Sequence, residues 1–195
     1  MEYQPGKNKI ITDNRASAIL YRFLNNKNDK GLIIVPVNIC QIVVETIIKA
    51  GFYPFYVDIN EENLCLDFNA TKVVIGQKND VKGVIINHTY GIDYNFSDNI
   101  FELKKKWNGF VVEDKCLSKP VISLMTNADL TLYSTGYAKY IELEYGGGVG
   151  ISGEDNNFDC ERQVIQINAS TELIVNDFNI TVERYLSDIH CNLEI

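Results

Sequence analysis

The sequence predicts an α/β domain in which helices cover both faces of a mostly parallel sheet. Short apolar runs that read as buried strands alternate with segments of helical period along most of the chain, which is the pattern typical of such sheets. The 195 residues suffice for one α/β domain, and a content of 46% hydrophobic and 23% charged residues is ordinary for a globular protein.

The predicted helices are recognised by their apolar spacing and by the signals at their ends. Asn14 is expected to cap a first helix that runs to about residue 24. The segment 39–50 has a helical period and ends at Gly51, a residue suited to the C-terminus of a helix. A third helix is expected over 96–107, and the basic run 104–106 is interpreted as its solvated face.

The predicted strands lead to the candidate site. In chain order they cover 32–35, 53–57, 73–75, 84–86, 110–112, 130–133 and the glycine-rich stretch 146–151. Ligands of open parallel sheets bind at the carboxyl ends of the strands. The residues of interest are therefore Asn87-His88, Glu113-Asp114 and the segment from Ser134 to Lys139. We expect this domain to span 1–152 and a helical tail to follow over 153–195.

Charge and cysteine content exclude several classes of function. A formal net charge of −8 argues against non-specific binding to nucleic acid. The five cysteines are odd in number, widely spaced and without a CxxC pair. Neither a disulfide framework nor a zinc site is therefore expected, and we expect the protein to occupy a reducing compartment. There is no signal-peptide pattern at the N-terminus and no apolar run near the ~20 residues that span a bilayer. We therefore expect a cytoplasmic protein without a membrane partner or a metal.

Two charged residues are the candidates for chemistry. Asp114 follows a buried strand, where a carboxylate is either functional or a capping group. Lys139 lies among small and aromatic residues, where desolvation would lower the pKa of its amine and make it nucleophilic, although a surface lysine is the alternative. The stretch 146–150 is rich enough in glycine to cradle a phosphate, but it matches neither GxGxxG nor a GK[ST] loop.

Several short segments, taken in order, resemble one family. They are Asn14-Arg15-Ala16-Ser17-Ala18, Val35-Pro36-Val37-Asn38-Ile39-Cys40, Ala50-Gly51-Phe52-Tyr53-Pro54, Val57-Asp58-Ile59, Asn87-His88-Thr89-Tyr90-Gly91, Val112-Glu113-Asp114, the Ser134-to-Lys139 segment and the glycine-rich run. Over residues 10–152 their order and spacing resemble the DegT/DnrJ/EryC1/StrS family of aminotransferases that depend on pyridoxal 5′-phosphate (PLP). The resemblance implies the large domain of a fold type I PLP-dependent transferase.

The resemblance implies a role for each matching residue. Lys139 would bond covalently to the aldehyde carbon of PLP and then move a proton at the substrate carbon. Asp114 would pair with the pyridine nitrogen and keep it protonated. Ser134 and the helix start at Ala16 and Ser17 would hold the phosphate. His88 would line the pocket, with a buried structural histidine as the alternative.

The resemblance also implies substrates and partners. An amino-acid donor, with glutamate expected, would pass its amino group to a nucleotide-linked keto-sugar. The family forms homodimers and continues into a small C-terminal domain that is absent from these 195 residues. Dehydratases of the family carry histidine at the lysine position, so Lys139 favours transamination.

Three departures from the family pattern keep other hypotheses open. Asn14-Arg15 stands where a small residue pair is common, Ile39-Cys40 where many members stack an aromatic ring on PLP, and Cys116-Leu117 where many carry Ala followed by Gln or His. A large-domain fragment or paralogue that keeps the fold without turnover is therefore the second hypothesis. A binding module with an unrelated doubly wound fold is the third.

Overall fold

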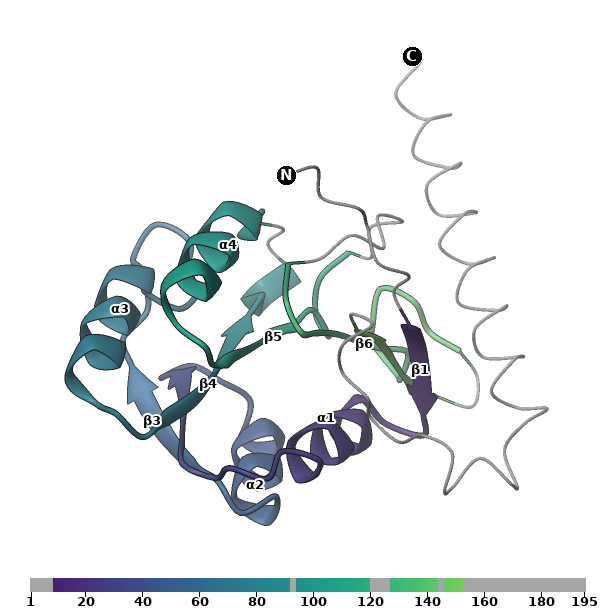
Figure 1. Cartoon of the computed structure of the whole chain (residues 1–195). Helices are drawn as coiled ribbons and strands as arrows, with labels where there is room; N and C mark the ends of the chain where they lie inside the picture. The colour runs from purple at the N-terminus through teal and green to yellow at the C-terminus, as the bar shows by residue number, and fades with distance from the viewer. Residues whose placement is uncertain (1–8, 92–93, 120–126, 144–145, 153–195) are drawn as a thin grey trace, which may run out of the picture.

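The computed structural model describes residues 9–91, 94–119, 127–143 and 146–152. Within these ranges seven strands form one sheet, in the order β1-β7-β6-β5-β4-β2-β3 (Figure 1). The strands are β1 (Lys9–Asp13), β2 (Leu32–Pro36), β3 (Tyr53–Val57), β4 (Val81–Asn87), β5 (Phe110–Asp114), β6 (Leu130–Ser134) and β7 (Gly148–Ser152). The helices are α1 (Ala16–Asn25), α2 (Gln41–Lys49), α3 (Phe68–Gln77) and α4 (Ser97–Lys106), with the 3-10 turn η1 at Thr89–Gly91.

Most of the sheet is parallel, as the sequence predicts. Strands β3, β2, β4, β5 and β6 pair in parallel, and β7 runs antiparallel to both of its neighbours, β6 and β1. The register aligns Asn87 with Asp114 and Asp114 with Leu132. The carboxyl ends of β4, β5 and β6 therefore lie side by side at one edge of the sheet.

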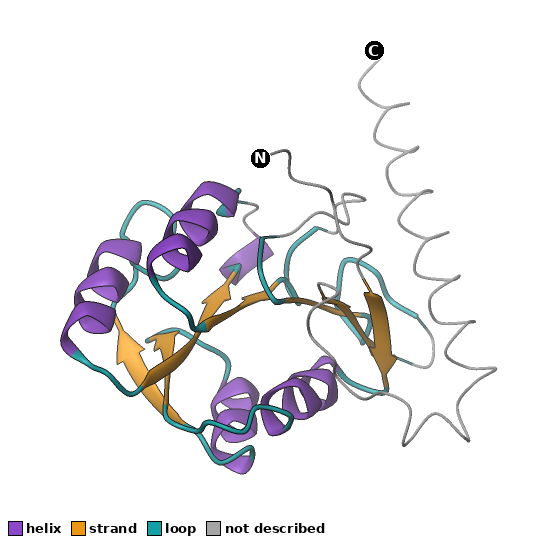
Figure 2. Ribbon diagram, viewed as in Figure 1, coloured by secondary structure: helices purple, strands orange, loops and turns teal. Residues whose placement is uncertain are grey.

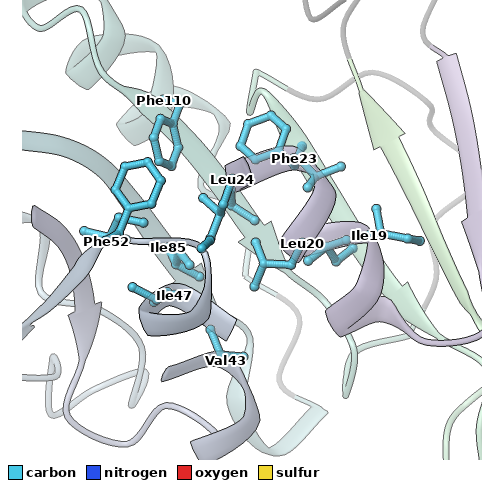
Figure 3. Close-up of a cluster of buried hydrophobic side chains, with 14 of the residues drawn as sticks. Ile19, Leu20, Phe23, Leu24, Val43, Ile47, Phe52, Ile85 and Phe110 are labelled. Atoms are coloured by element: carbon cyan, nitrogen blue, oxygen red, sulfur yellow. The ribbon is translucent and has the colours of Figure 1, made fainter. Parts of the chain in front are cut away.

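Helices cover both faces of the sheet, with α1 and α2 on one face and α3 and α4 on the other (Figures 1 and 2). On the α1/α2 face, apolar side chains from both helices and from β4 and β5 point toward one another (Figure 3). The rings of Phe23 and Phe52 each meet Phe110 edge to face, at centroid distances of 5.5 and 6.0 Å. Each large side chain buried in this way stabilises the fold by roughly 1.5–3 kcal/mol.

The apolar run 73–75 was predicted as a strand, and this prediction is wrong because the run lies inside α3. Asp67 caps the helix, since its side chain accepts hydrogen bonds from the backbone N–H groups of Asn69 and Ala70 at 2.7 and 3.1 Å. Phe68 and Thr71 of α3 are buried, whereas Val73 is exposed. Three adjacent apolar residues fit either period, and the cap together with the buried face decides for the helix.

The N-terminal helix also departs from its prediction. Its N-cap residue is Arg15, which makes no side-chain capping bond, so Asn14 is not the cap. The backbone N–H of Asn14 instead donates to the side chain of Asp13. The predicted C-terminal signal of α2 is confirmed, because Gly51 follows the helix at a φ of +83°.

Strand β1 was not predicted, and the tail expected over 153–195 lies outside the described residues. The boundary at residue 152 therefore stays a prediction. None of the helices in the described ranges is long and apolar enough to cross a membrane.

Candidate functional site

A cavity of about 790 Å³ opens where the carboxyl ends of β4, β5 and β6 meet the first turn of α1. The six residues that the sequence singles out for the site all line it. They are Ala16, Ser17, His88, Asp114, Ser134 and Lys139. Because these residues come from four separate segments of the chain, the fold brings them together at the edge where parallel sheets bind ligands.

Asp114 and Lys139 lie close enough to act on the same neighbour, the thiol of Cys116. Burial raises the pKa of this thiol well above its ordinary value of 9.0, the Asp114 carboxylate raises it further, and the Lys139 ammonium opposes the shift. The Asp114 carboxylate also accepts a hydrogen bond from the backbone N–H of Cys116 at 3.0 Å. The site therefore holds one fixed carboxylate and one amine in the same cavity.

A tight turn after β6 presents Lys139 to the cavity. The backbone N–H of Lys139 donates to the carbonyl of Gly136 at 3.2 Å. Ala138 has a left-handed φ of +58°, and its N–H donates to the Glu142 carboxylate at 3.1 Å. The side chain of Lys139 is half-buried. A lysine on a strained, hydrogen-bonded turn is held in place more firmly than one on a free loop.

The first turn of α1 also lines the cavity. This end of the helix has no side-chain cap and no acidic residue, so the partial positive charge of its N–H groups faces the cavity uncompensated. The adjacent glycines Gly146 and Gly147 have φ of +67° and +138°, a backbone that L side chains rarely adopt. These features together make a wall that favours an anion such as a phosphate.

The helix start rests directly on Gly148. A Cβ atom at this position would overlap the backbone of Ala16 and of Arg15. We expect Gly148→Ala to push the first turn of α1 away from β7, to lower the free energy of unfolding by ~1–3 kcal/mol and to weaken binding of an anionic ligand. Chemical denaturation and phosphate-ligand titration would measure the two effects.

Gly76→Ala is the matched control for this prediction. Gly76 lies in α3, and a Cβ there would meet no atom within 4 Å. Alanine favours a helix over glycine by up to ~1 kcal/mol, so this substitution should leave stability unchanged or raise it. Equal effects of the two substitutions on stability would refute the assigned role of Gly148.

His88 lines the cavity, but its ring is held from the other face of the sheet. The imidazole is fully buried, with Nε2 at 2.9 Å from Oε1 of Glu113 and the ring centroid at 5.2 Å from that of Phe96. Side chains alternate along a strand, so Glu113 and Asp114 point to opposite faces. The backbone N–H of His88 donates to the Asp114 carbonyl at 2.9 Å. This geometry favours support of the strand ends over direct contact with a ligand.

A polar group to which the sequence analysis gave no role also lines the cavity; of its members, only Asn87 was among the residues of interest. The side-chain N–H of Asn38 donates to the carbonyl of Leu64 at 2.9 Å, and that of Asn87 donates to Oδ1 of Asn38 at 3.2 Å and also to Thr89. Asn38, Asn87 and Thr89 all line the cavity. The rule that located Asp114, a polar residue directly after a buried strand, also fits Asn87. Among the described residues, no group of three or more ligating side chains could hold a metal.

Comparison with known proteins identifies the family. The model of the DegT/DnrJ/EryC1/StrS aminotransferase family matches residues 3–120. The chain belongs to this family. The match rules out the hypothesis of an unrelated doubly wound binding module, and the aminotransferases of this family use PLP as their cofactor.

One curated relative is the 3-oxo-glucose-6-phosphate:glutamate aminotransferase of Bacillus subtilis (strain 168). It is 26% identical over 150 residues, which cover 75% of this chain and 32% of the relative. The chain thus spans about a third of the length of this DegT/DnrJ/EryC1/StrS family relative.

Solved structures share the fold. NtdA from Bacillus subtilis, with its cofactor PMP bound, superposes with a TM-score of 0.66 at 21% identity, over 76% of this chain and 33% of that one. DesI in the presence of its TDP-sugar product gives 0.65 at 15% identity, over 75% and 38%. The GDP-4-keto-6-deoxy-D-mannose-3-dehydratase of E. coli, with bound hydrated PLP, gives 0.63 at 18% identity, over 77% and 40%.

Proposed function

We propose that this chain carries the cofactor-binding part of a PLP-dependent sugar aminotransferase. The observation that carries the proposal is the cavity that Lys139, Asp114 and the uncapped start of α1 line together. An amine, a carboxylate and an anion-binding wall are the three groups that PLP requires of a protein. The residues present therefore fit the cofactor that the family uses.

Each side chain has a proposed task. Lys139 holds the cofactor and moves the proton at the carbon that loses or gains the amino group. Asp114 accepts a hydrogen bond from the pyridine N–H and keeps that nitrogen charged. Ser134 and the N–H groups of Ala16 and Ser17 bind the phosphate. When bound, PLP carries the amino group from donor to acceptor and stabilises negative charge at the reacting carbon.

His88 is proposed to act indirectly, through the position of Asp114. Its backbone bond to Asp114 and its buried contact with Glu113 fix the ends of β4 and β5. We assign it to positioning of the carboxylate rather than to contact with PLP.

The proposed substrates are glutamate as amino donor and a keto-sugar that carries phosphate as acceptor. The nucleotide-linked sugar implied by the family resemblance is one form of such an acceptor. The name of the Bacillus subtilis relative favours a sugar phosphate as another. A homodimer is also proposed, because Tyr90, Leu117 and Tyr137 are exposed at 69%, 45% and 88% near the cavity. The cytoplasmic location and the absence of nucleic-acid and membrane partners stay predictions.

A family member without turnover is the second candidate, and specific residues favour it. Ile39 and Leu117 line the cavity where polar or aromatic contacts with PLP are common in the family. Cys116, between Asp114 and Leu117, is half-buried, and its thiol is uncharged because desolvation and the Asp114 carboxylate raise its pKa. A cavity with fewer polar contacts to the ring would keep the fold while it binds PLP weakly.

A single-turnover experiment separates the two candidates. The PLP-loaded protein is mixed with glutamate, and 2-oxoglutarate is measured. The aminotransferase is expected to release 2-oxoglutarate in an amount equal to the bound PLP. PLP that stays bound without release of 2-oxoglutarate would refute the aminotransferase and support the non-catalytic candidate.

A further inference from the structure

Arg15 is an unfavourable residue for the N-cap position of a helix. It is the N-cap of α1, with an extended backbone at φ −154° and ψ 146°. Ser, Thr, Asp and Asn are preferred there because their side chains accept hydrogen bonds from the backbone N–H groups of the first turn. A guanidinium has no acceptor. Its positive charge is also repelled by the partial positive charge at the helix N-terminus.

An anion in the cavity would remove both disadvantages. Arg15 lines the cavity, and its side chain is exposed whereas that of Ala16 is buried. Among the described residues no ion pair involves Arg15, while the nearby Arg22 pairs with Asp13. The backbone of Arg15 is fixed against Gly148. The Arg15 guanidinium is thus an unpaired cation at the rim of the cavity, attached to a backbone whose position is fixed.

The charges of the cavity indicate which anion it serves. Apart from His88, which is paired with Glu113, the charged residues in the described lining are Arg15, Asp114 and Lys139. Under the proposed function Lys139 and Asp114 are engaged by PLP, and the N–H groups of Ala16 and Ser17 by its phosphate. Arg15 then remains as the charged side chain for whatever enters after the cofactor. In a protein of net charge −8, an anionic substrate needs such a cation.

We infer that Arg15 determines substrate specificity by binding a phosphate group of the sugar substrate at the rim of the cavity. This inference rests on the proposed function. The guanidinium presents a planar fork of N–H donors that matches the oxygen atoms of a phosphate. The phosphate belongs either to a hexose phosphate or to the diphosphate of a nucleotide sugar, and both offer the same chemistry to Arg15.

The test compares Arg15→Gln with Arg15→Lys and the unchanged protein, all loaded with PLP. Calorimetry measures binding of glucose 6-phosphate and of UDP-glucose, with glucose as the uncharged control. Glutamine removes the charge and keeps the length, so we expect at least about a fivefold loss of affinity for the preferred phosphorylated ligand. Lysine should restore part of that affinity, and binding of glucose should not change. Whichever phosphorylated ligand loses affinity identifies the source of the phosphate.

A separate titration of PLP decides whether Arg15 serves the substrate or the cofactor. We expect the affinity for PLP to change less than twofold in Arg15→Gln. A parallel loss of PLP and of phosphorylated sugar would overturn the inference, as would unchanged binding of both phosphorylated ligands. Failure of the unchanged protein to hold PLP on Lys139 would instead refute the proposed function, so the two failures are distinguishable.

Discussion

Replacing Lys139 with alanine is expected to abolish covalent attachment of PLP while the fold stays intact. Among the lining residues that the structure describes, Lys139 is the amine that the cavity presents. Its side chain is half-buried and belongs to none of the hydrophobic core clusters of the described residues, so its loss should change stability by less than about 1 kcal/mol. Borohydride reduction followed by mass spectrometry of peptides measures the attachment, and circular dichroism measures the fold.

Lys105→Ala provides the matched control for this experiment. Lys105 is an exposed residue of α4, a helix on the opposite face of the sheet from α1. Removal of its amine should leave trapping of PLP unchanged. PLP that is still reduced onto the Lys139→Ala protein at the level of the unchanged protein would show that another amine holds the cofactor.

Replacing Asp114 with asparagine is expected to slow release of 2-oxoglutarate from glutamate by roughly two- to thirtyfold at saturating PLP. An amide keeps the shape and an acceptor for the N–H of Cys116, but it carries no charge to hold the pyridine nitrogen protonated. A charge-assisted hydrogen bond is worth ~1.5–3 kcal/mol against about 1 for a neutral one. A difference of about 1.4 kcal/mol corresponds to a factor of ten in rate.

Asp80→Asn controls for the loss of a carboxylate as such. Asp80 is exposed and directly precedes β4. It therefore lies at the amino end of that strand, whereas the cavity lies at the carboxyl end. Its replacement should leave the rate unaffected. If Asp114→Asn released 2-oxoglutarate as fast as Asp80→Asn, Asp114 would have no part in the chemistry.

The parts of the fold that sequence reasoning predicted are those fixed by local pattern. The strand 53–57 matches β3 residue for residue, and the runs 110–112 and 130–133 lie within β5 and β6. A buried parallel strand is a continuous apolar run, which a single chain segment displays by itself. The location of Asp114 and Ser134 at strand ends followed from the same runs.

The features that were missed depend on contacts between distant segments. Strand β1 has only two apolar residues in its middle, Ile10 and Ile11, and it is extended because it pairs antiparallel with β7. The seat of α1 on Gly148 likewise joins residues far apart in the chain. Arg15 could not be recognised as the N-cap because its side chain lacks the acceptor on which that prediction relies.

The contact between the start of α1 and Gly148 also bears on how the chain folds. Ala16 is made early, but the surface that locates it does not exist until β7 has joined the sheet between β6 and β1. Contacts between such distant segments form slowly, because the entropy of closing the long loop is lost before they are gained. The wall proposed to bind the phosphate therefore depends on a contact between distant segments, and PLP would bind there only after β7 has joined the sheet. A ligand that binds only the native state shifts the folding equilibrium toward that state by mass action. A higher concentration of PLP would therefore raise the fraction of molecules in which β7 is paired with β6 and β1.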